Sequence, residues 1–324
     1  MKSFAIPATL AFILSACGGG GSSPDTSGTP EPPPPSPALA SLTVKPLADN
    51  KVRLTLSGVS AQASRYCIRQ DATGPLASDP CFSDGDSTAL VQEKSITPSN
   101  SQRVVFTAWV LSGSTVSRHA SVSAPGKTCS AAAYAALTTA NTTLPAVCII
   151  TGTGSTTYES VLRLESVKAP ITVANFLRYV NQGFYDQTVF HRFLKGNVAT
   201  SPPGVNVVQG GGFSHDGSNY VAKASTLPAI VLESTVTTAL SNTAGTIAMA
   251  RTNDPDSGTA GFFVNTANNK DTFDSKTTRD GYAVFGSFIH GAQSWTDLLN
   301  SVSGASEVIN PSTLVRLHWA YQIQ

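Results

Sequence analysis

The stretch APITVANFLRYVNQGFYDQTVFHRF, residues 169–193, carries the strongest local pattern in the chain. One apolar helical face is formed by four residues spaced at i, i+3, i+4 and i+7: Val173, Phe176, Leu177 and Val180. Thr172 fits an N-cap, and Gly183 stops the helix. The aromatic and β-branched residues that follow, ending in Phe190-His191-Arg192-Phe193, predict a strand that buries its phenylalanines while Arg192 projects elsewhere.

Four further blocks follow this stretch in order. They are Gln209-Gly210-Gly211-Gly212-Phe213, Gly245-Thr246-Ile247-Ala248-Met249-Ala250-Arg251, Phe262-Phe263-Val264-Asn265 and Gly281-Tyr282-Ala283-Val284-Phe285-Gly286. Together the five blocks resemble the cyclophilins, a family of peptidyl-prolyl cis-trans isomerases. The resemblance covers residues 145–324 and implies an eight-stranded antiparallel β-barrel capped by two helices. The second helix would span Ser294 to Val302 and bury Trp295, Leu298, Leu299 and Val302.

The resemblance also implies the catalytic residues. Rotation about a peptide C–N bond must break resonance, at a cost of ~18–20 kcal/mol. A cation or donor aimed at the prolyl nitrogen lowers this barrier, because the nitrogen lone pair reappears in the twisted state. Arg192 is the candidate, since an arginine stays protonated and donates from a rigid fork. Gln209 would hold the substrate backbone or position the guanidinium.

The remaining site residues form a groove around the substrate proline. By the resemblance, the apolar floor is made of Val207, Phe263 and Phe273. Other substrate-binding candidates are Asn206 beside Val207, Ala250 and Arg251 along the groove, Tyr282 at the pocket edge, and His191. No cofactor or metal is expected.

Blander interpretations apply to several of these residues. An isolated arginine is most often a surface or ion-pairing residue, and His191 is more readily structural, hydrogen-bonded inside the barrel, than catalytic. Phe262 faces the core if Phe263 faces the pocket, because strand neighbours alternate. Gly210 to Gly212 is not a phosphate loop, since no Gly-Lys-Ser/Thr follows.

The chain departs from the family pattern in three places. The segment Gly196 to Asn206 is an insertion, so that Arg192 and Gln209 are 17 residues apart. Asn206 and Val207 replace a larger apolar pair. Ala260-Gly261 replaces the usual Ser-Gln, and Thr272 stands where cyclophilins carry an aromatic rim residue that contacts cyclosporin. Retention of Arg192 favours an isomerase, whereas the altered pocket favours the alternative, a non-catalytic module that holds Pro-containing segments.

The N-terminus predicts export and lipidation. Residues 1–16 combine a charged start with a short apolar run, which indicates a signal peptide. Leu14-Ser15-Ala16-Cys17 resembles a bacterial lipobox, with lipid on Cys17; an ordinary signal peptide is the alternative. A Gly/Pro/Ser-rich linker follows over residues 17–38. We therefore expect a monomer anchored in the bacterial cell envelope and facing the periplasm, with the outer membrane favoured over the inner.

Four other cysteines indicate disulfides in an oxidising compartment. Three pairings are possible, and the local one, Cys67–Cys81 with Cys129–Cys148, is the simplest. Each closure would stabilise the fold by ~3 kcal/mol in the chain-entropy model. The alternative is four free buried thiols.

The N-terminal half predicts a separate β-domain. Over residues 39–125, alternating apolar residues such as Val52, Leu54 and Leu56 indicate a small immunoglobulin- or fibronectin-like β-sandwich without a catalytic constellation. Residues 126–144 would connect the two domains through a short Ala-rich helix over Ser130 to Ala140.

The net charge of +1, from 21 basic and 20 acidic residues, excludes charge-driven nucleic-acid binding as the main function. The expected partners are Pro-containing polypeptides and the membrane.

Overall fold

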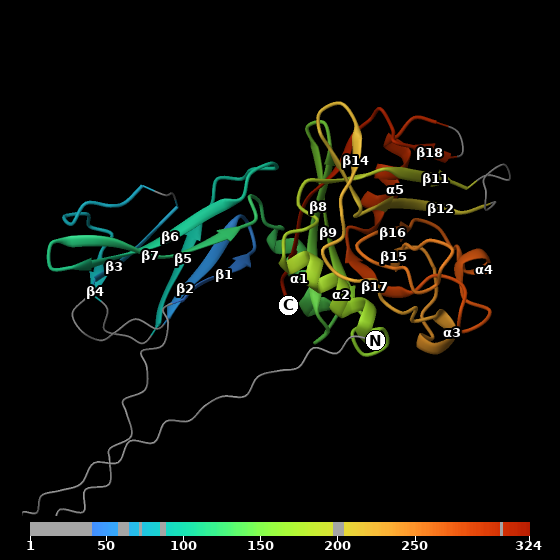
Figure 1. Ribbon diagram of the computed structural model, residues 1–324, viewed down its shortest axis with the longest axis horizontal. Coiled ribbons are helices and arrows are strands. Elements are labelled where there is room, and N and C mark those ends of the chain that lie inside the picture. The colour runs from blue at the N-terminus through green and yellow to red at the C-terminus, as the bar shows by residue number, and fades with distance from the viewer. Residues whose placement is uncertain (1–40, 58–64, 71–72, 85–88, 197–203, 305–306) are drawn as a thin grey trace, which may run out of the picture. The chain divides into compact units, whose positions relative to one another are not determined.

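The computed structural model describes residues 41–57, 65–70, 73–84, 89–196, 204–304 and 307–324 (Figure 1). The predicted signal peptide, Cys17 and the linker lie outside the described residues. Among the helices of the described ranges, none is long and apolar enough to cross a membrane.

The N-terminal region is a β-sandwich, as predicted. Its strands are β1 (Ser41–Leu47), β2 (Lys51–Ser57), β3 (Arg65–Arg69), β4 (Ser83–Asp84), β5 (Ala89–Ser95), β6 (Val104–Ser112) and β7 (Thr115–Ala124). One antiparallel sheet has the order β1-β2-β5 and the other β4-β3-β6-β7. The two sheets bury a shared core, because Val52, Leu54 and Leu56 of the first cluster with Ile68 and Phe106 of the second.

The connecting helix α1 (Ala131–Thr139) lies where the Ala-rich segment predicted it. Ser130 is its N-cap and accepts a hydrogen bond from the Ala133 amide through its hydroxyl. The Ser130 backbone N–H also donates to Glu159 Oε2 at 2.8 Å. The helix start is thus fixed by both a local cap and a distant carboxylate.

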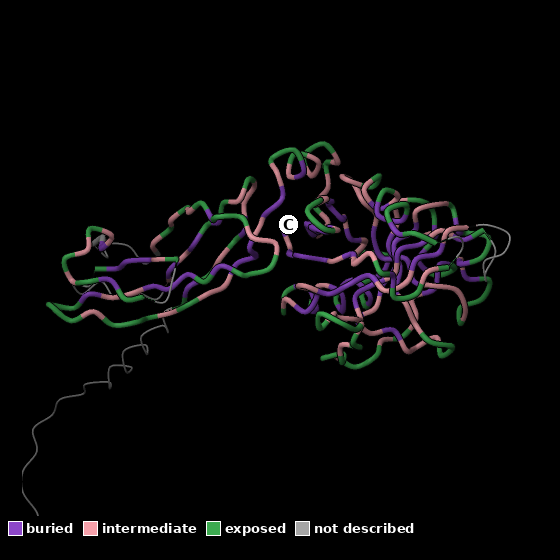
Figure 2. The backbone as a smooth tube through the Cα atoms, turned by 90° about the horizontal axis from the view of Figure 1, so that it is seen from above, coloured by how far each residue is buried: buried purple, intermediate pink, exposed green. Residues whose placement is uncertain are grey.

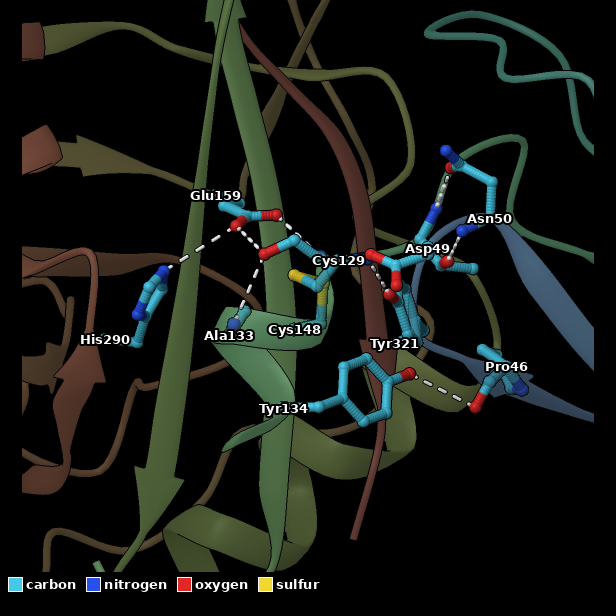
Figure 3. The surroundings of a disulfide bond; sticks show 12 residues. Pro46, Asp49, Asn50, Cys129, Ala133, Tyr134, Cys148, Glu159, His290 and Tyr321 are labelled. Carbon is cyan, nitrogen blue, oxygen red and sulfur yellow. Dashed lines mark hydrogen bonds and ion pairs between the residues drawn. A yellow bond between two sulfur atoms is a disulfide. The ribbon is translucent and has the colours of Figure 1, made fainter. Parts of the chain in front are cut away.

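Two disulfides join the cysteines in the predicted local pairing, Cys67–Cys81 and Cys129–Cys148. Figure 3 shows the second, which ties the segment before α1 to strand β8 (Ala146–Thr153). Both of its cysteines are fully buried, and the Cys129 amide donates to the Tyr321 hydroxyl at 2.6 Å. The pairing of all four thiols removes the alternative of free buried cysteines.

The C-terminal region is built on one antiparallel sheet. Besides β8, its strands are β9 (Thr156–Leu164), β10 (Thr188–Phe190), β11 (Arg192–Lys195), β12 (Asn206–Gly210), β15 (Thr246–Met249), β16 (Phe262–Asn265), β17 (Val284–His290), β18 (Glu307–Ile309) and β19 (Val315–Gln322). Their order is β10-β19-β8-β9-β17-β15-β16-β12-β11-β18. A short hairpin, β13 (Phe213–His215) with β14 (Tyr220–Ala222), stands apart.

The sheet curls on itself at His191. This single residue separates β10, at one end of the strand order, from β11, near the other end. Counted as one bent strand, β10 and β11 complete eight strands, the number predicted for the barrel. Strand β18 is an addition to that pattern, paired to the outer edge of β11.

Two helices cap the sheet interior, as predicted, with small differences at their ends. Helix α2 (Pro170–Asn181) buries Val173, Phe176 and Val180, and α5 (Ala292–Ser301) buries Trp295, Leu298 and Leu299, all in the same core as the strands. In Figure 2 the buried residues gather in the interior of this region, with exposed segments around them. Two short helices of this region, α3 (Thr235–Thr238) and α4 (Lys270–Phe273), are single turns.

The predicted N-cap of α2 is wrong. The helix begins at Pro170, so Thr172 lies within its first turn. Glu233, from a distant loop, accepts from the amides of Ile171 and Thr172 at 3.1 and 2.7 Å. This carboxylate satisfies the free N–H groups that a local cap would otherwise bind.

Candidate active site

Strands β11 and β12 form a hairpin that places Arg192 directly opposite Gln209. Arg192 Nη1 donates to Gln209 Oε1 at 3.3 Å. Their separation of 17 positions does not keep them apart, because an antiparallel pair places its two ends side by side whatever the length of the connection. The insertion lies at the far end of the hairpin, and its residues 197–203 are outside the described chain.

The alternation of strand side chains divides this part of the sheet into two faces. Phe193, Val208 and Val264 point into the barrel core. Their strand neighbours Leu194, Val207 and Phe263 belong to a separate apolar cluster on the outer face. We call it the outer cluster, and its members are Leu194, Val205, Val207, Ala248, Phe263, Phe273 and Val284. Phe262 lies in the core and Phe263 in the outer cluster, as the sequence predicted.

A pocket opens over the outer cluster beside Arg192 and Gln209. Its lining residues are Arg192, Leu194, Val207, Gln209, Ala250, Arg251, Phe263, Phe273 and Tyr282. The pocket therefore brings seven other predicted site residues together with Arg192. Its ninth lining residue, Leu194, was not predicted. Period-two spacing from Arg192 could have identified Leu194, because it lies two residues further along the same strand.

Three aromatic rings form one wall of the pocket. Phe263, Phe273 and Tyr282 contact one another edge to face, with centroid separations of 5.3, 5.2 and 4.9 Å. Phe263 comes from β16, Phe273 from the end of α4 and Tyr282 from the loop before β17. Edge-to-face packing from three separate elements fixes the shape of the apolar wall.

Arg251 closes the other side of the groove and is tied down by its surroundings. Its guanidinium lies over the Tyr282 ring, 4.9 Å from the centroid. Its Nε donates to the Gly281 carbonyl at 2.9 Å and its Nη1 to the Thr252 carbonyl at 2.8 Å. These contacts make Arg251 a rigid wall as well as a positive charge.

A buried asparagine network supports the aromatic wall from behind. Asn242 Nδ2 donates to the carbonyls of Phe273 and Tyr282 at 3.2 and 3.3 Å. Asn265 Nδ2 donates to Asn242 Oδ1, and Asn269 Nδ2 donates to Asn265 Oδ1. Such satisfied buried networks hold their neighbours in one arrangement. No sequence motif indicated this network, which depends on contacts between residues far apart in the chain.

His191 and Asn206 lie outside the pocket lining. The His191 ring packs on Phe213 with a centroid separation of 4.2 Å, and Nδ1 is buried without a hydrogen-bond partner among the described residues. The expected hydrogen bond inside the barrel is therefore replaced, at Nδ1, by aromatic packing. Burial, together with the adjacent positive charge of Arg192, lowers the pKa of His191 to about 4. His191 is neutral at pH 7.

Two glycines after Gln209 are required by close approach. A Cβ at Gly210 would lie 2.5 Å from the Phe190 ring, and one at Gly211 would lie 2.7 Å from the Ala260 carbonyl oxygen. Gly211 also has a φ of +85°, which side chains disfavour. These glycines are therefore needed for close packing behind the pocket. This agrees with the sequence analysis, which found no phosphate loop here.

The pocket offers donors and apolar surface. Its polar groups are two guanidinium groups, one amide and one phenol. A guanidinium has no lone pair for a metal, and the lining contains no carboxylate, thiol or imidazole among the described residues. The arrangement suits a ligand with a small apolar ring next to an atom that can accept a hydrogen bond.

Arg192 has a second partner that the sequence did not indicate. Its Nε donates to Glu307 Oε1 at 2.6 Å. Glu307 lies on β18, 115 residues further along the chain. Only the pairing of β18 with β11 brings the two residues together.

Comparison with known proteins places residues 151–318, slightly more than half of the chain, in a family described as "Cyclophilin type peptidyl-prolyl cis-trans isomerase/CLD". A peptidyl-prolyl cis-trans isomerase A of Dickeya dadantii is 43% identical over 133 residues, covering 41% of this chain and 61% of that protein. A peptidyl-prolyl cis-trans isomerase of Acinetobacter baylyi is 40% identical, covering 40% of this chain and 61% of that protein. The cyp18 isomerase of Streptomyces antibioticus is 40% identical over 146 residues, covering 44% of this chain and 76% of that protein.

The match thus spans less than two thirds of the first two relatives. The family match over residues 151–318 includes the hairpin that pairs Arg192 with Gln209 and the three residues of the aromatic wall. By sequence family, this chain belongs to the cyclophilin-type peptidyl-prolyl cis-trans isomerases.

Proposed function

We propose that the chain is an active peptidyl-prolyl cis-trans isomerase that acts on Xaa-Pro bonds of polypeptides. The observation that carries the proposal is the pairing of Arg192 and Gln209 at the rim of an apolar pocket. Family membership and the names of the relatives support the same activity. No acid, base or nucleophile is needed for this reaction.

The barrier is electronic, and Arg192 acts on it. In the planar amide the prolyl nitrogen lone pair is delocalised into the carbonyl, whereas in the twisted state it is localised and accepts a hydrogen bond. A guanidinium N–H that donates to this nitrogen stabilises the twisted state more than either planar isomer. The uncatalysed exchange takes tens to hundreds of seconds, so even a modest difference in stabilisation is measurable.

The apolar wall provides the grip that makes the donor effective. Val207, Phe263 and Phe273 are each less than 7% exposed and present a fixed surface for the proline ring. With the ring held, rotation moves the carbonyl side of the bond while the prolyl nitrogen stays near Arg192. Gln209 holds the guanidinium in place, and its amide N–H₂, which binds no described residue, can donate to the substrate backbone.

A protease-coupled assay with an Xaa-Pro peptide tests the activity on the full mature chain. The wild type should accelerate cis-to-trans conversion, and Arg192→Ala should lose most of this acceleration. Arg53→Ala is a matched control, because Arg53 also forms an exposed Arg–Glu pair, with Glu93, but lies in the β-sandwich. Equal activity of Arg192→Ala and wild type would contradict the role of Arg192.

The cellular setting belongs to the same proposal. We place the enzyme at the bacterial cell envelope, anchored by lipid on Cys17, where it accelerates folding of envelope proteins. The lipobox-like motif and two disulfides support this location, because disulfides persist in oxidising compartments. Intact-mass analysis of membrane-extracted protein should show an acyl mass that Cys17→Ser abolishes; a soluble mature form with another N-terminus would contradict it.

A non-catalytic module that holds Pro-containing segments is the second candidate. It is favoured by Gly261, which presents no side chain, and by Thr272, which is exposed where an aromatic residue is expected. Peptide binding without accelerated isomerisation would support this function and exclude the first.

A further inference from the structure

Strand β18 brings a carboxylate to the catalytic arginine from outside the pocket. It pairs with the edge of β11 that β12 leaves open, with Arg192 opposite Ile309 and Leu194 opposite Glu307. Directly opposed residues share a face of a sheet, and so do residues two apart on one strand. Glu307 therefore lies diagonal to Arg192 on the pocket face, on the side away from Gln209.

Arg192 is consequently held from two sides. Its Nε donates to Glu307 Oε1 at 2.6 Å, and its Nη1 donates to Gln209 Oε1 at 3.3 Å. Of the five guanidinium N–H groups, these use two, and the other three bind no described residue. Glu307 is absent from the pocket lining, so its contact leaves the pocket side of the guanidinium open.

The pair contributes little to folding. Both side chains are about one third exposed, at 34% and 31%, and exposed ion pairs typically contribute only ~0–1 kcal/mol. Its effect on geometry is larger, because an arginine side chain has many rotamers and a displacement of about 1 Å can cost about 100-fold in rate. A carboxylate that accepts from Nε selects the rotamers in which the fork lies over the pocket.

We propose that Glu307 is a positioning residue, which orients the Arg192 guanidinium for the isomerisation. This inference rests on the proposed function. The positioning role requires a hydrogen-bond acceptor at position 307 but no negative charge, since a negative charge at this distance weakens the positive potential that Arg192 offers to the prolyl nitrogen. Glu307→Gln keeps the acceptor without the charge, whereas Glu307→Ala removes both, so the two variants test the acceptor separately from the charge.

The test compares kcat and KM of four full-length chains in an Xaa-Pro assay: wild type, Glu307→Ala, Glu307→Gln and Glu93→Ala. Glu93→Ala removes the exposed partner of Arg53 in the β-sandwich and is the matched control. Glu307→Ala should lower kcat/KM about 10-fold, mainly through kcat. Glu307→Gln should stay within about threefold of wild type, and Glu93→Ala should equal wild type. In an Arg192→Ala background, Glu307→Ala should have no further effect.

A second readout does not depend on turnover. The Arg192 Nε–H signal in ¹⁵N NMR should be protected from solvent exchange in wild type and Glu307→Gln, and lost in Glu307→Ala. An active wild type with unchanged or increased activity in Glu307→Ala would overturn the positioning role alone. Equal losses in Glu307→Gln and Glu307→Ala would also overturn it, in favour of a charge effect. An inactive wild type would overturn the proposed function itself, and with it the reaction that Glu307 is proposed to serve.

Discussion

The two faces of strands β11, β12 and β16 differ in what they require of their residues. On the inner face, Phe193, Val208 and Val264 are fully buried in the barrel core, where volume and shape decide. On the outer face, Arg192 and Gln209 are partly exposed and hydrogen-bonded to each other. Adjacent residues of one strand thus serve stability and chemistry separately. Substitutions on the two faces should therefore affect different measurements.

The largest expected effect is on the inner face. Phe193→Ala should lower the free energy of unfolding by about 3–5 kcal/mol, because it leaves a cavity in a close-packed core. The kcat/KM of the fraction that remains folded should stay within about threefold of wild type. Urea denaturation and an activity assay below the unfolding transition measure the two quantities. A loss of activity without a loss of stability would show that the faces are not separate.

The outer face should show the opposite result. Arg192→Ala should lower kcat/KM at least ~100-fold, which corresponds to about 2.7 kcal/mol of transition-state stabilisation. The free energy of unfolding should change by less than about 1 kcal/mol, since the residue is partly exposed and its ion pair is weak. Urea denaturation and the activity assay again measure the two quantities. A large loss of stability in Arg192→Ala would contradict the separation of the two faces.

His191, at the bend between β10 and β11, should make the stability of the fold depend on pH. Burial and the neighbouring Arg192 charge lower its folded-state pKa to about 4 from an ordinary value of about 6.5. Between these values the unfolded chain binds a proton that the folded chain does not, so acid destabilises the fold. From pH 7.5 to pH 5, wild type should lose about 2 kcal/mol more than His191→Gln. Parallel stability curves for the two proteins would show that His191 is not desolvated.

The smallest expected effect is at the pocket rim. Thr272 lies on α4 next to the pocket residue Phe273. Thr272→Trp should tighten cyclosporin binding about 10-fold, if the indole recovers about 50 Å² of apolar contact at ~25 cal/mol per Å². Asp271→Trp adds the same ring to the neighbouring exposed position and serves as control. Equal tightening by both variants would mean that Thr272 does not occupy the rim.

The sequence predicted the parts of this site that follow local rules or the family pattern. Alternation alone separated Phe262 from Phe263, and the resemblance identified Arg192, Gln209 and the pocket wall. It did not predict the start of α2, because the capping Glu233 lies 62 residues from Ile171. Glu307 and the asparagine network were missed for the same reason. Their partners are set by strand register and loop packing, which no short motif encodes.

The most direct test of the central claim is exchange NMR on an Xaa-Pro peptide, which observes cis–trans interconversion in the presence of the protein without a coupling protease. We predict that full-length wild type accelerates interconversion far beyond the uncatalysed exchange of tens to hundreds of seconds. Arg192→Ala should bind the same peptide but give at least ~100-fold less acceleration at equal saturation. Peptide binding by wild type without accelerated interconversion would contradict the account, because the pocket would then hold proline without catalysing its isomerisation.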